Sequence, residues 1–362
     1  MSLELLAFDD VLKQINTHQT NNRTAVKKCL LLGNGFSVAY NAKRFSYTNL
    51  LETALNENII SRNSNIHKVF QKLNTADFEK VIRYMDGLKN LIKIYQPDFD
   101  KKQLERDIKN LKKHLVNTIT NNHPESSKTI TNEESKACAS FLRNFHKIYS
   151  LNYDLLAYWV IMQNRGLSYS DGFGDNAEDN GYDPENPDCD YESYLDEFVV
   201  YKDTTHDLMF LHGGLHLYDH NTEAIKLTFC RTDKILKKQI FENLVRGIYP
   251  IFISEGHSKD KLEKIRHNYY LNHCYKSLTK QGGDLVIFGT ALKSNDEHIR
   301  KAIIEGSFSN IYAGVFGEDD AKSLSSLSDD IKLYNNNHPK KRNKTQVYLY
   351  DARQVNPWGR QL

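Results

Sequence analysis

Asn152, Asp154 and His212 are the residues whose types and spacing most directly suggest chemistry. The first two follow a short apolar run in YSLNYDL, and the histidine follows another in FLHGGLHLY. An amide can position a water or a carboxamide, and a carboxylate can stabilise positive charge. A histidine near its ordinary pKa can accept a proton from a hydroxyl. The alternative is structural: Asn152 and Asp154 can cap the following helix, and His212 can be a structural histidine.

A glycine-rich turn suggests a second kind of chemistry. Gly33, Asn34, Gly35, Phe36 and Ser37 follow the apolar run LLL and precede a segment with helical spacing. Glycines let the backbone approach a phosphate closely, and a helix start favours an anion. Ser37 could bond a phosphate oxygen or cap the helix. The full G-x-G-x-x-G pattern is absent because Val38 follows, so a simple tight turn remains the alternative.

A third group of polar residues follows the apolar run DLVIFG. Gly289 and Thr290 end this run, and Ser294 and Asp296 come shortly after. In a doubly wound fold, such a turn commonly holds an adenosine ribose or the adenine edge. The hydroxyl groups of Thr290 and Ser294 and the carboxylate of Asp296 could bond the ribose. Asp296 could equally do no more than begin the next helix.

Buried parallel strands are needed to position these groups. Each group follows an apolar run that stops abruptly, and ligands of open α/β sheets bind at the carboxyl ends of the strands. Strand and helix patterns alternate along the chain, which predicts a Rossmann-like α/β fold with a mostly parallel sheet. Expected strands are 26–32, 147–151, 225–232, 249–253, 284–289, 309–316 and 345–351. Expected helices include 233–247, one long helix over about 259–280, and 295–304, with a polar loop at 335–344.

The domain organisation predicted from the sequence is one α/β domain over residues 1–362. Residues 50–145 contain apolar residues at helical spacing and are expected to form a helical insertion. Residues 171–197 contain eleven acidic residues and no lysine or arginine, and are expected to be a solvated acidic loop. A calcium site there is conceivable, but the EF-hand spacing is not met.

Composition excludes several classes of protein. The chain has 362 residues and a net charge of +2, so it has no general footprint for nucleic acid. Neither a membrane-length apolar run nor a secretory pattern is recognisable, so a cytoplasmic location is expected. The five cysteines form no C-x-x-C pair, and no metal is expected. His212 and His216 could form a metal pair, but Gly-Gly between them disfavours a helix and no third ligand is obvious.

Taken together, these segments resemble the SIR2-like superfamily, and most closely the bacterial DUF4917 group within it. The resemblance spans about residues 26–316. It rests on the following segments: Gly33-Asn34-Gly35-Phe36-Ser37, Asp77-Phe78-Glu79, Asn152-Tyr153-Asp154, His212-Gly213-Gly214-Leu215-His216, Ser254-Glu255-Gly256 with Lys261, Arg266-His267-Asn268-Tyr269-Tyr270-Leu271, and Gly289-Thr290 with Ser294-Asn295-Asp296-Glu297-His298.

The resemblance implies a fold that binds NAD at the glycine turn and uses NAD as a substrate. It places Asn152 at the nicotinamide end and makes His212 the catalytic base. The zinc-binding cysteine pairs of sirtuin deacylases are missing, which argues against protein deacylation. The turn reads G-N-G-F-S where those enzymes have G-A-G-x-S. Proteins of this kind are associated with bacterial antiphage defence, where they consume NAD, and some act beside a HerA-like ATPase.

The leading hypothesis is therefore hydrolysis of the nicotinamide–ribose bond of NAD to nicotinamide and ADP-ribose. Asn152, Asp154 and His212 would be catalytic, and a homo-oligomer is expected because an uncontrolled NAD hydrolase would harm its host. The competing hypothesis is a sensor that binds NAD or ADP-ribose and signals to a partner without hydrolysis. The joint presence of the three catalytic candidates favours the hydrolase.

Overall fold

The computed structural model describes most of the chain. It covers residues 5–21, 26–45, 50–124, 126–164, 166–173, 196–197, 206–220, 223–226, 236–253, 258–339 and 344–360. The expected acidic loop lies almost wholly outside these ranges, as does the end of the strand expected over 225–232. Within the described part, no helix is both long and apolar enough to cross a membrane.

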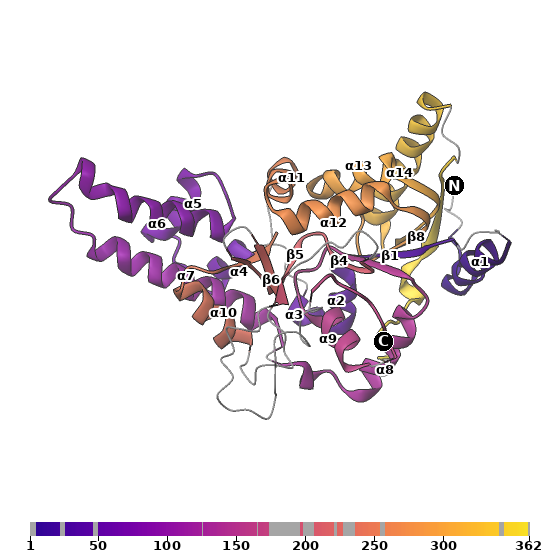
Figure 1. Ribbon diagram of the computed structural model, residues 1–362, viewed down its shortest axis with the longest axis horizontal. Helices are drawn as coiled ribbons and strands as arrows, with labels where there is room; N and C mark the ends of the chain where they lie inside the picture. The colour runs from indigo at the N-terminus through magenta and orange to yellow at the C-terminus, as the bar shows by residue number, and fades with distance from the viewer. Residues whose placement is uncertain are drawn as a thin grey trace.

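A six-stranded sheet in which all neighbouring strands are parallel forms the centre of the fold (Figure 1). Its strands, in spatial order, are β10 (Gln346–Asp351), β9 (Ser307–Val315), β8 (Gly282–Phe288), β1 (Lys28–Leu32), β2 (Lys147–Ser150) and β4 (Leu208–Phe210). The chain begins at the central strand β1, adds β2 and β4 on one side, and then adds β8, β9 and β10 on the other. This strand order is typical of doubly wound dinucleotide-binding folds. The predicted Rossmann-like fold class is confirmed.

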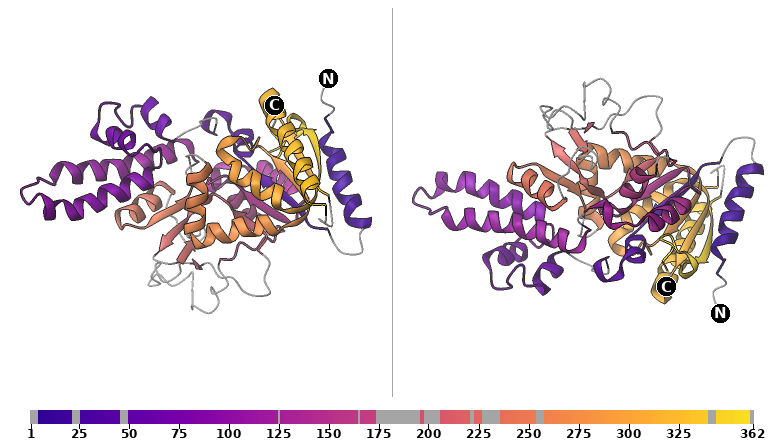
Figure 2. Two further views of the ribbon diagram at one scale, coloured as in Figure 1. Left: turned by 90° about the horizontal axis from the view of Figure 1, so that it is seen from above. Right: turned by 90° about the horizontal axis from the view of Figure 1, so that it is seen from below.

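Helices cover both faces of this sheet. In Figures 1 and 2 one layer contains α11 (Ser258–His267), α12 (Tyr269–Lys280), α13 (Glu297–Glu305) and α14 (Glu318–Asn337). The opposite layer contains α2 (Gly35–Tyr40), α8 (Asn132–Leu142) and α9 (Leu156–Gln163), with α3 (Ala42–Phe45) nearby. The inner strand residues Leu30, Leu31 and Ile287 are fully buried, as expected of a sheet that is covered on both faces.

A second, antiparallel sheet lies beside the carboxyl ends of the parallel strands. It consists of β3 (Asp196–Glu197), β6 (Glu223–Lys226), β5 (Gly213–His220) and β7 (Tyr249–Phe252), in that order. Gly213 has a φ of +72°, and a side chain there would meet the carbonyl of Ile251. The glycine therefore lets β5 turn out of the path of β4 and pair closely with β7.

Two helices differ from the sequence-based expectation. The helix expected over 259–280 is broken at Asn268, whose extended backbone ends α11 and whose side chain accepts a hydrogen bond from Leu271 N–H to cap α12. The apolar spacing continues across this break and so does not reveal it. The helix α14 is not expected from the sequence. Its buried residues Leu324, Leu327 and Ile331 recur at helical spacing but stand among many polar ones, and its last residues, 335–337, fall in the polar loop expected over 335–344.

The helical segment expected over 50–145 has two parts. Its first part is an arm of α4 (Leu50–Asn56), α5 (Asn65–Lys72), α6 (Phe78–Tyr95) and α7 (Lys102–Asn122), and the α6–α7 hairpin extends away from the sheet in Figures 1 and 2. The arm contacts α10 (Leu236–Val245) through α7. The second part, α8, returns to the layer that covers the sheet, after a 3₁₀ turn (Ser127–Thr129).

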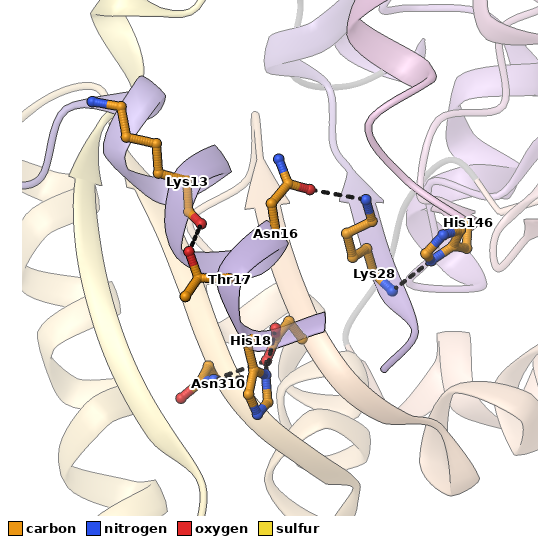
Figure 3. Close-up of polar contacts among 8 residues, drawn as sticks. Lys13, Asn16, Thr17, His18, Lys28, His146 and Asn310 are labelled. Atoms are coloured by element: carbon orange, nitrogen blue, oxygen red, sulfur yellow. Dashed lines mark hydrogen bonds and ion pairs between the residues drawn. The ribbon is translucent and has the colours of Figure 1, made fainter. Parts of the chain in front are cut away.

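The first helix, α1 (Phe8–Asn21), is fixed at the amino-terminal edge of the parallel sheet (Figure 3). Its His18 contacts both carboxylate oxygens of Asp284 on β8 at 2.8 and 3.0 Å, and Asn310 donates to the same carboxylate at 2.9 Å. Asp284 is fully buried, so these two partners compensate a charge that water cannot reach. Lys28 provides a further link, because its Nζ donates to Asn16.

Candidate functional site

The predicted groups meet at one edge of the parallel sheet. In the strand register, Leu32 lies opposite Ser150 on one side and Phe288 on the other, and Ser150 lies opposite Phe210. The four strands therefore end side by side, and the residues that follow them come together at one edge of the sheet. This is the strand-order switch point, where ligands of open α/β sheets bind.

A pocket of about 310 Å³ opens at this edge. Its walls come from the four predicted segments, together with residues near α3, β7 and α11. The lining residues are Gly33, Asn34, Phe45, Leu151, Asn152, Tyr153, Asp154, His212, Ile253, Lys261, Gly289, Thr290, Asn295 and Asp296. Eight of the twelve residues proposed from the sequence therefore line one pocket, whereas Gly35, Phe36, Ser37 and Ser294 do not.

The glycine turn packs directly against the turn after β8. A Cβ atom on Gly33 would lie 2.6 Å from the carbonyl oxygen of Gly289, and one on Gly35 would lie 2.5 Å from the Cα of Gly289. The N–H groups of Gly33 and Gly35 donate to Phe288 and Gly289, and the N–H of Ser37 donates to Asn34. These donors are used within the protein, so the glycines serve close backbone packing, and the turn does not present these three amides to a phosphate.

The side chains of the same turn are also engaged. Phe36 is fully buried and packs on Trp358 with ring centroids 4.9 Å apart, and its carbonyl accepts the Trp358 indole N–H. The side chain of Asn34 donates to the carbonyl of Phe45. Ser294 is exposed in a 3₁₀ turn (Ser294–Asp296) outside the pocket wall. Phe36 and Ser294 therefore do not line the pocket.

Asn152, Ser37 and Asp154 form a buried hydrogen-bond network at the pocket floor. Asn152 Nδ2 donates to the carbonyl of Gly33 at 3.1 Å and to Ser37 Oγ at 3.0 Å. Ser37 in turn donates to Asp154 Oδ2 at 2.5 Å, while Asp154 Oδ1 accepts from Leu156 N–H. Both amide hydrogens of Asn152 are consumed, so Oδ1 is the group it can offer to a ligand.

The ionisation of Asp154 is set by opposing effects. Burial raises the pKa of this carboxyl, whereas the hydrogen bonds from Ser37 and Leu156 act in the opposite direction. Both oxygens accept protein donors and orient the network that holds Asn152. The structure thus favours a positioning role for Asp154 over direct contact with a ligand charge.

His212 lies in the pocket wall against a second histidine, His298 of α13. Their Nε2 atoms are 3.1 Å apart, and the rings are stacked. Burial lowers the pKa of His212 to about 3, and a hydrogen bond to the backbone of Leu151 opposes this shift. Burial likewise lowers the pKa of His298 to about 4. Both imidazoles are therefore neutral at pH 7.

An ion pair completes this side of the pocket. Lys261 of α11 donates to Asp296 Oδ1 at 2.9 Å, and its side chain is only 5% exposed. Burial alone would raise the pKa of Asp296, but attraction to His212, which is charged only in the acid range where this carboxyl titrates, and to Lys261 outweighs burial and holds the pKa of Asp296 below its ordinary value. Asp296 thus remains an anion within reach of the two histidines.

His216 does not join His212, because its ring packs against residues of α9 and β4. Its ring stacks on Tyr158 with centroids 4.4 Å apart and meets Phe210 edge-on. Within the described part of the chain, neither of its ring nitrogens has a hydrogen-bond partner. The His212–His216 metal pair considered from the sequence is therefore excluded by this geometry.

The roles of three residues at the site, Lys261, His298 and Ser258, were not predicted from the sequence. Lys261 and His298 belong to segments that carry the family resemblance, but their chemistry depends on partners far along the chain. Ser258 contacts both the backbone N–H and the Nδ1 atom of His298. The local signal that could have indicated this pair is that Asp296 and His298 stand two residues apart at the start of α13.

Comparison with known proteins gives a family but no function. No curated protein matches the chain. The family model described as "Domain of unknown function (DUF4917)" matches residues 30–358, which include every residue of the pocket and all of both sheets except the first two residues of β1. The chain therefore belongs to the DUF4917 family.

Proposed function

We propose that this protein is a SIR2-like NAD⁺ hydrolase that cleaves the nicotinamide–ribose bond and releases nicotinamide and ADP-ribose. The observation that carries the proposal is the meeting of Asn152, Asp154 and His212 in one pocket, at the switch point of a sheet with the dinucleotide-binding strand order. The pocket volume of about 310 Å³ lies at the lower end of the range for ligand sites and suits the reacting half of a dinucleotide.

The chemistry asked of the site is limited. Nicotinamide departs neutral from a pyridinium, so the leaving group needs no general acid. The site must stabilise an oxocarbenium-like ribose and deliver water to its anomeric carbon. Both tasks require oriented hydrogen-bond acceptors, and the pocket provides them through Asn152 and His212.

Asn152 is proposed to hold the water or the nicotinamide carboxamide through Oδ1. Its amide nitrogen is fixed by Gly33 and Ser37, so the orientation of Oδ1 is set before a ligand arrives. Preorganisation of this kind avoids an energetic cost during the reaction. Asp154 acts through Ser37, which makes it a positioning residue.

His212 is proposed to accept a hydrogen bond from a ribose hydroxyl or from the attacking water. With a pKa of about 3 it is neutral at pH 7, so its lone pair is available. The same low pKa makes it a weak base. A ligand that bonds to Nε2 must also replace the contact with His298.

Two observations favour the alternative of an NAD or ADP-ribose sensor without hydrolysis. The weak basicity of His212 suits ligand holding better than proton removal. The N–H groups of Gly33, Gly35, Phe36 and Ser37 donate within the protein, so these four amides of the turn do not form the phosphate cradle that many nucleotide enzymes have. In this case Asn152 and His212 recognise a ligand without activating water.

NAD consumption by the purified protein, resolved by chromatography, separates the two functions. We expect nicotinamide and ADP-ribose in equal amounts, and a loss of rate of at least about 100-fold in Asn152→Ala and His212→Ala. The exposed residue His267 offers a matched control, and His267→Ala should retain full rate. Folding of each variant is checked by circular dichroism and thermal melting.

The two functions give different results in this experiment. Saturable NAD or ADP-ribose binding without turnover identifies the sensor. Turnover that survives in a folded His212→Ala protein contradicts the assignment of the site. A hydrolase of this kind needs control, and we extend the proposal to an NAD-depleting role in antiphage defence. Control would come from a homo-oligomer or a HerA-like ATPase, so the assay is run alone and with the product of the neighbouring gene.

A further inference from the structure

Three side chains that are common metal ligands come together at the pocket, two of them in its wall and one directly behind it. His212, Asp296 and His298 each offer one ligand atom, and these atoms lie within 4.8 Å of one another. Both histidines are 3% exposed, and the Asp296 side chain is 15% exposed. Two imidazoles and one carboxylate form a ligand set used for divalent transition metals, and they leave further coordination positions open.

The separation of the two imidazole nitrogens suits a shared ion. Zinc binds histidine nitrogen at about 2.0–2.1 Å, so an ion bound to both Nε2 atoms at their 3.1 Å separation would see them at an angle of roughly 95–102°. This value lies between octahedral and tetrahedral geometry. The oxygen of Asp296 lies within 4.8 Å of both imidazole nitrogens, and a change in its side-chain torsion can adjust its distance to a shared ion.

Each histidine has a partner on its outer nitrogen, as metal-binding histidines do. His298 Nδ1 lies 3.0 Å from Ser258 Oγ. The Nε2 of His212 faces His298, so its hydrogen bond to the Leu151 backbone uses Nδ1. A proton on Nδ1 leaves the lone pair of His212 on Nε2, which is the atom that would bind an ion.

Asp296 can serve an ion while it keeps its ion pair. Lys261 donates to Oδ1, and a carboxylate has a second oxygen that remains a donor to a metal. Ligating carboxylates commonly have such a hydrogen-bond partner, which fixes their orientation. His212 and Asp296 line the pocket, so the open coordination positions would face the ligand space.

We propose that His212, Asp296 and His298 form a binding site for one divalent transition-metal ion of the Zn²⁺ class. Mg²⁺ and Ca²⁺ are disfavoured, because they prefer oxygen ligands and two of the three groups are imidazoles. With a divalent ion and Lys261 beside a single carboxylate, the cluster has an excess of positive charge. This excess favours an anionic group of a ligand in the open position.

The site has a consequence that rests on the proposed function. The ion binds Nε2 of His212, which is the same lone pair that the proposed hydrolysis uses. Zn²⁺ is therefore expected to inhibit NAD turnover. Binding itself is measured without NAD, so failure of the metal site and failure of the hydrolase are distinguishable.

The test is equilibrium dialysis of the chelator-treated full-length protein against Zn²⁺, with bound metal counted by elemental analysis. We expect about one Zn²⁺ per chain, no competition from Mg²⁺, and a visible absorption band when Co²⁺ replaces Zn²⁺. His298→Ala and the near-isosteric Asp296→Asn should each weaken binding at least tenfold. His267→Ala, which removes an exposed histidine outside the cluster, should bind as the unmodified protein does.

Thermal melting keeps the result interpretable if a variant is less stable. Zn²⁺ should raise the melting temperature of the unmodified chain and of His267→Ala, but not that of His298→Ala. Absence of stoichiometric Zn²⁺, or equal binding by His298→Ala, would overturn the proposal and leave the 3.1 Å contact as an N–H···N hydrogen bond. Zn²⁺ binding without any NAD turnover would retain the metal site and refute the hydrolase.

Discussion

Replacement of Gly289 by alanine tests whether the turn at residues 33–37 and the turn after β8 pack too closely to admit a Cβ atom. Gly289 has a φ of +77°, which costs a residue with a Cβ atom about 1–2 kcal/mol. Its Cβ would also lie 2.7 Å from the nitrogen of Phe36 and 2.9 Å from the Cα and nitrogen of Gly35. These are backbone atoms that cannot rotate away, so overpacking adds about 1–3 kcal/mol.

The expected loss is therefore about 2–5 kcal/mol of unfolding free energy, which is a large share of a typical total. Two other glycines separate the contributions. Gly247 has a φ of +82°, but a Cβ atom there would meet no other atom within 4 Å, so Gly247→Ala should cost only about 1–2 kcal/mol. Gly87 lies inside α6 and also has open space, so Gly87→Ala should stabilise the protein by about 0.5–1 kcal/mol.

The measurement is urea denaturation of the three variants, followed by circular dichroism and fluorescence, with linear extrapolation to water. Coincidence of the two probes is needed before the free energies are compared. If Gly289→Ala loses no more stability than Gly247→Ala, the crowding effect is absent. That result would refute the explanation that these positions need glycine because the two turns pack closely. Close approach of a ligand to the backbone would then be the better explanation.

Two further predictions concern buried charge and acidity. Among the described residues, His18→Ala leaves the carboxylate of the buried Asp284 with Asn310 as its side-chain partner, and it should cost about 1–3 kcal/mol in urea denaturation. The exposed Lys13→Ala on the same helix should change stability by less than about 0.5 kcal/mol. Equal effects would show that His18 does not compensate the carboxylate. Burial lowers the pKa of His123 from 6.5 to about 4. Between these values the unfolded chain binds the proton and the folded chain does not, so stability falls as pH drops from about 6.5 towards 4. His123 accounts for a loss of unfolding free energy on the order of 3 kcal/mol at pH 4. In His123→Gln the loss of stability between about pH 6.5 and pH 4 should be smaller by that amount. Parallel pH profiles of the two proteins would contradict this prediction.

The inner strands of the parallel sheet were predictable because their signals are local, whereas the antiparallel pairing of β5 with β6 and β7 was not expected. The run from Cys29 to Leu32 and the run from Leu285 to Phe288 are apolar, and each ends at a glycine. Such a pattern suits only a strand buried on both faces. Since parallel strands place their carboxyl ends at one edge, the meeting of the four segments followed from the sequence.

Helix boundaries were less accessible to local reasoning. The apolar residues of α11 and α12 keep helical spacing across Asn268, and an asparagine inside a polar stretch is not by itself a stop signal. Its role as a cap depends on an extended backbone at that position, which local spacing did not reveal. For α14, the buried residues Leu324, Leu327 and Ile331 do recur at helical spacing, but three apolar positions among many polar ones are a weak signal.

The sequence by itself determined the fold class, the edge of the sheet that holds the site, and the presence there of Asn152, Asp154 and His212. Only the tertiary structure decided how these groups act. Four amides of the glycine turn, from Gly33 and from residues 35–37, are bonded within the protein. Ser37 connects Asn152 to Asp154, and His212 faces a histidine 86 positions away. Residue types and spacing follow from the local chain, whereas a hydrogen-bond partner or a pKa depends on which segments pack together and exclude water.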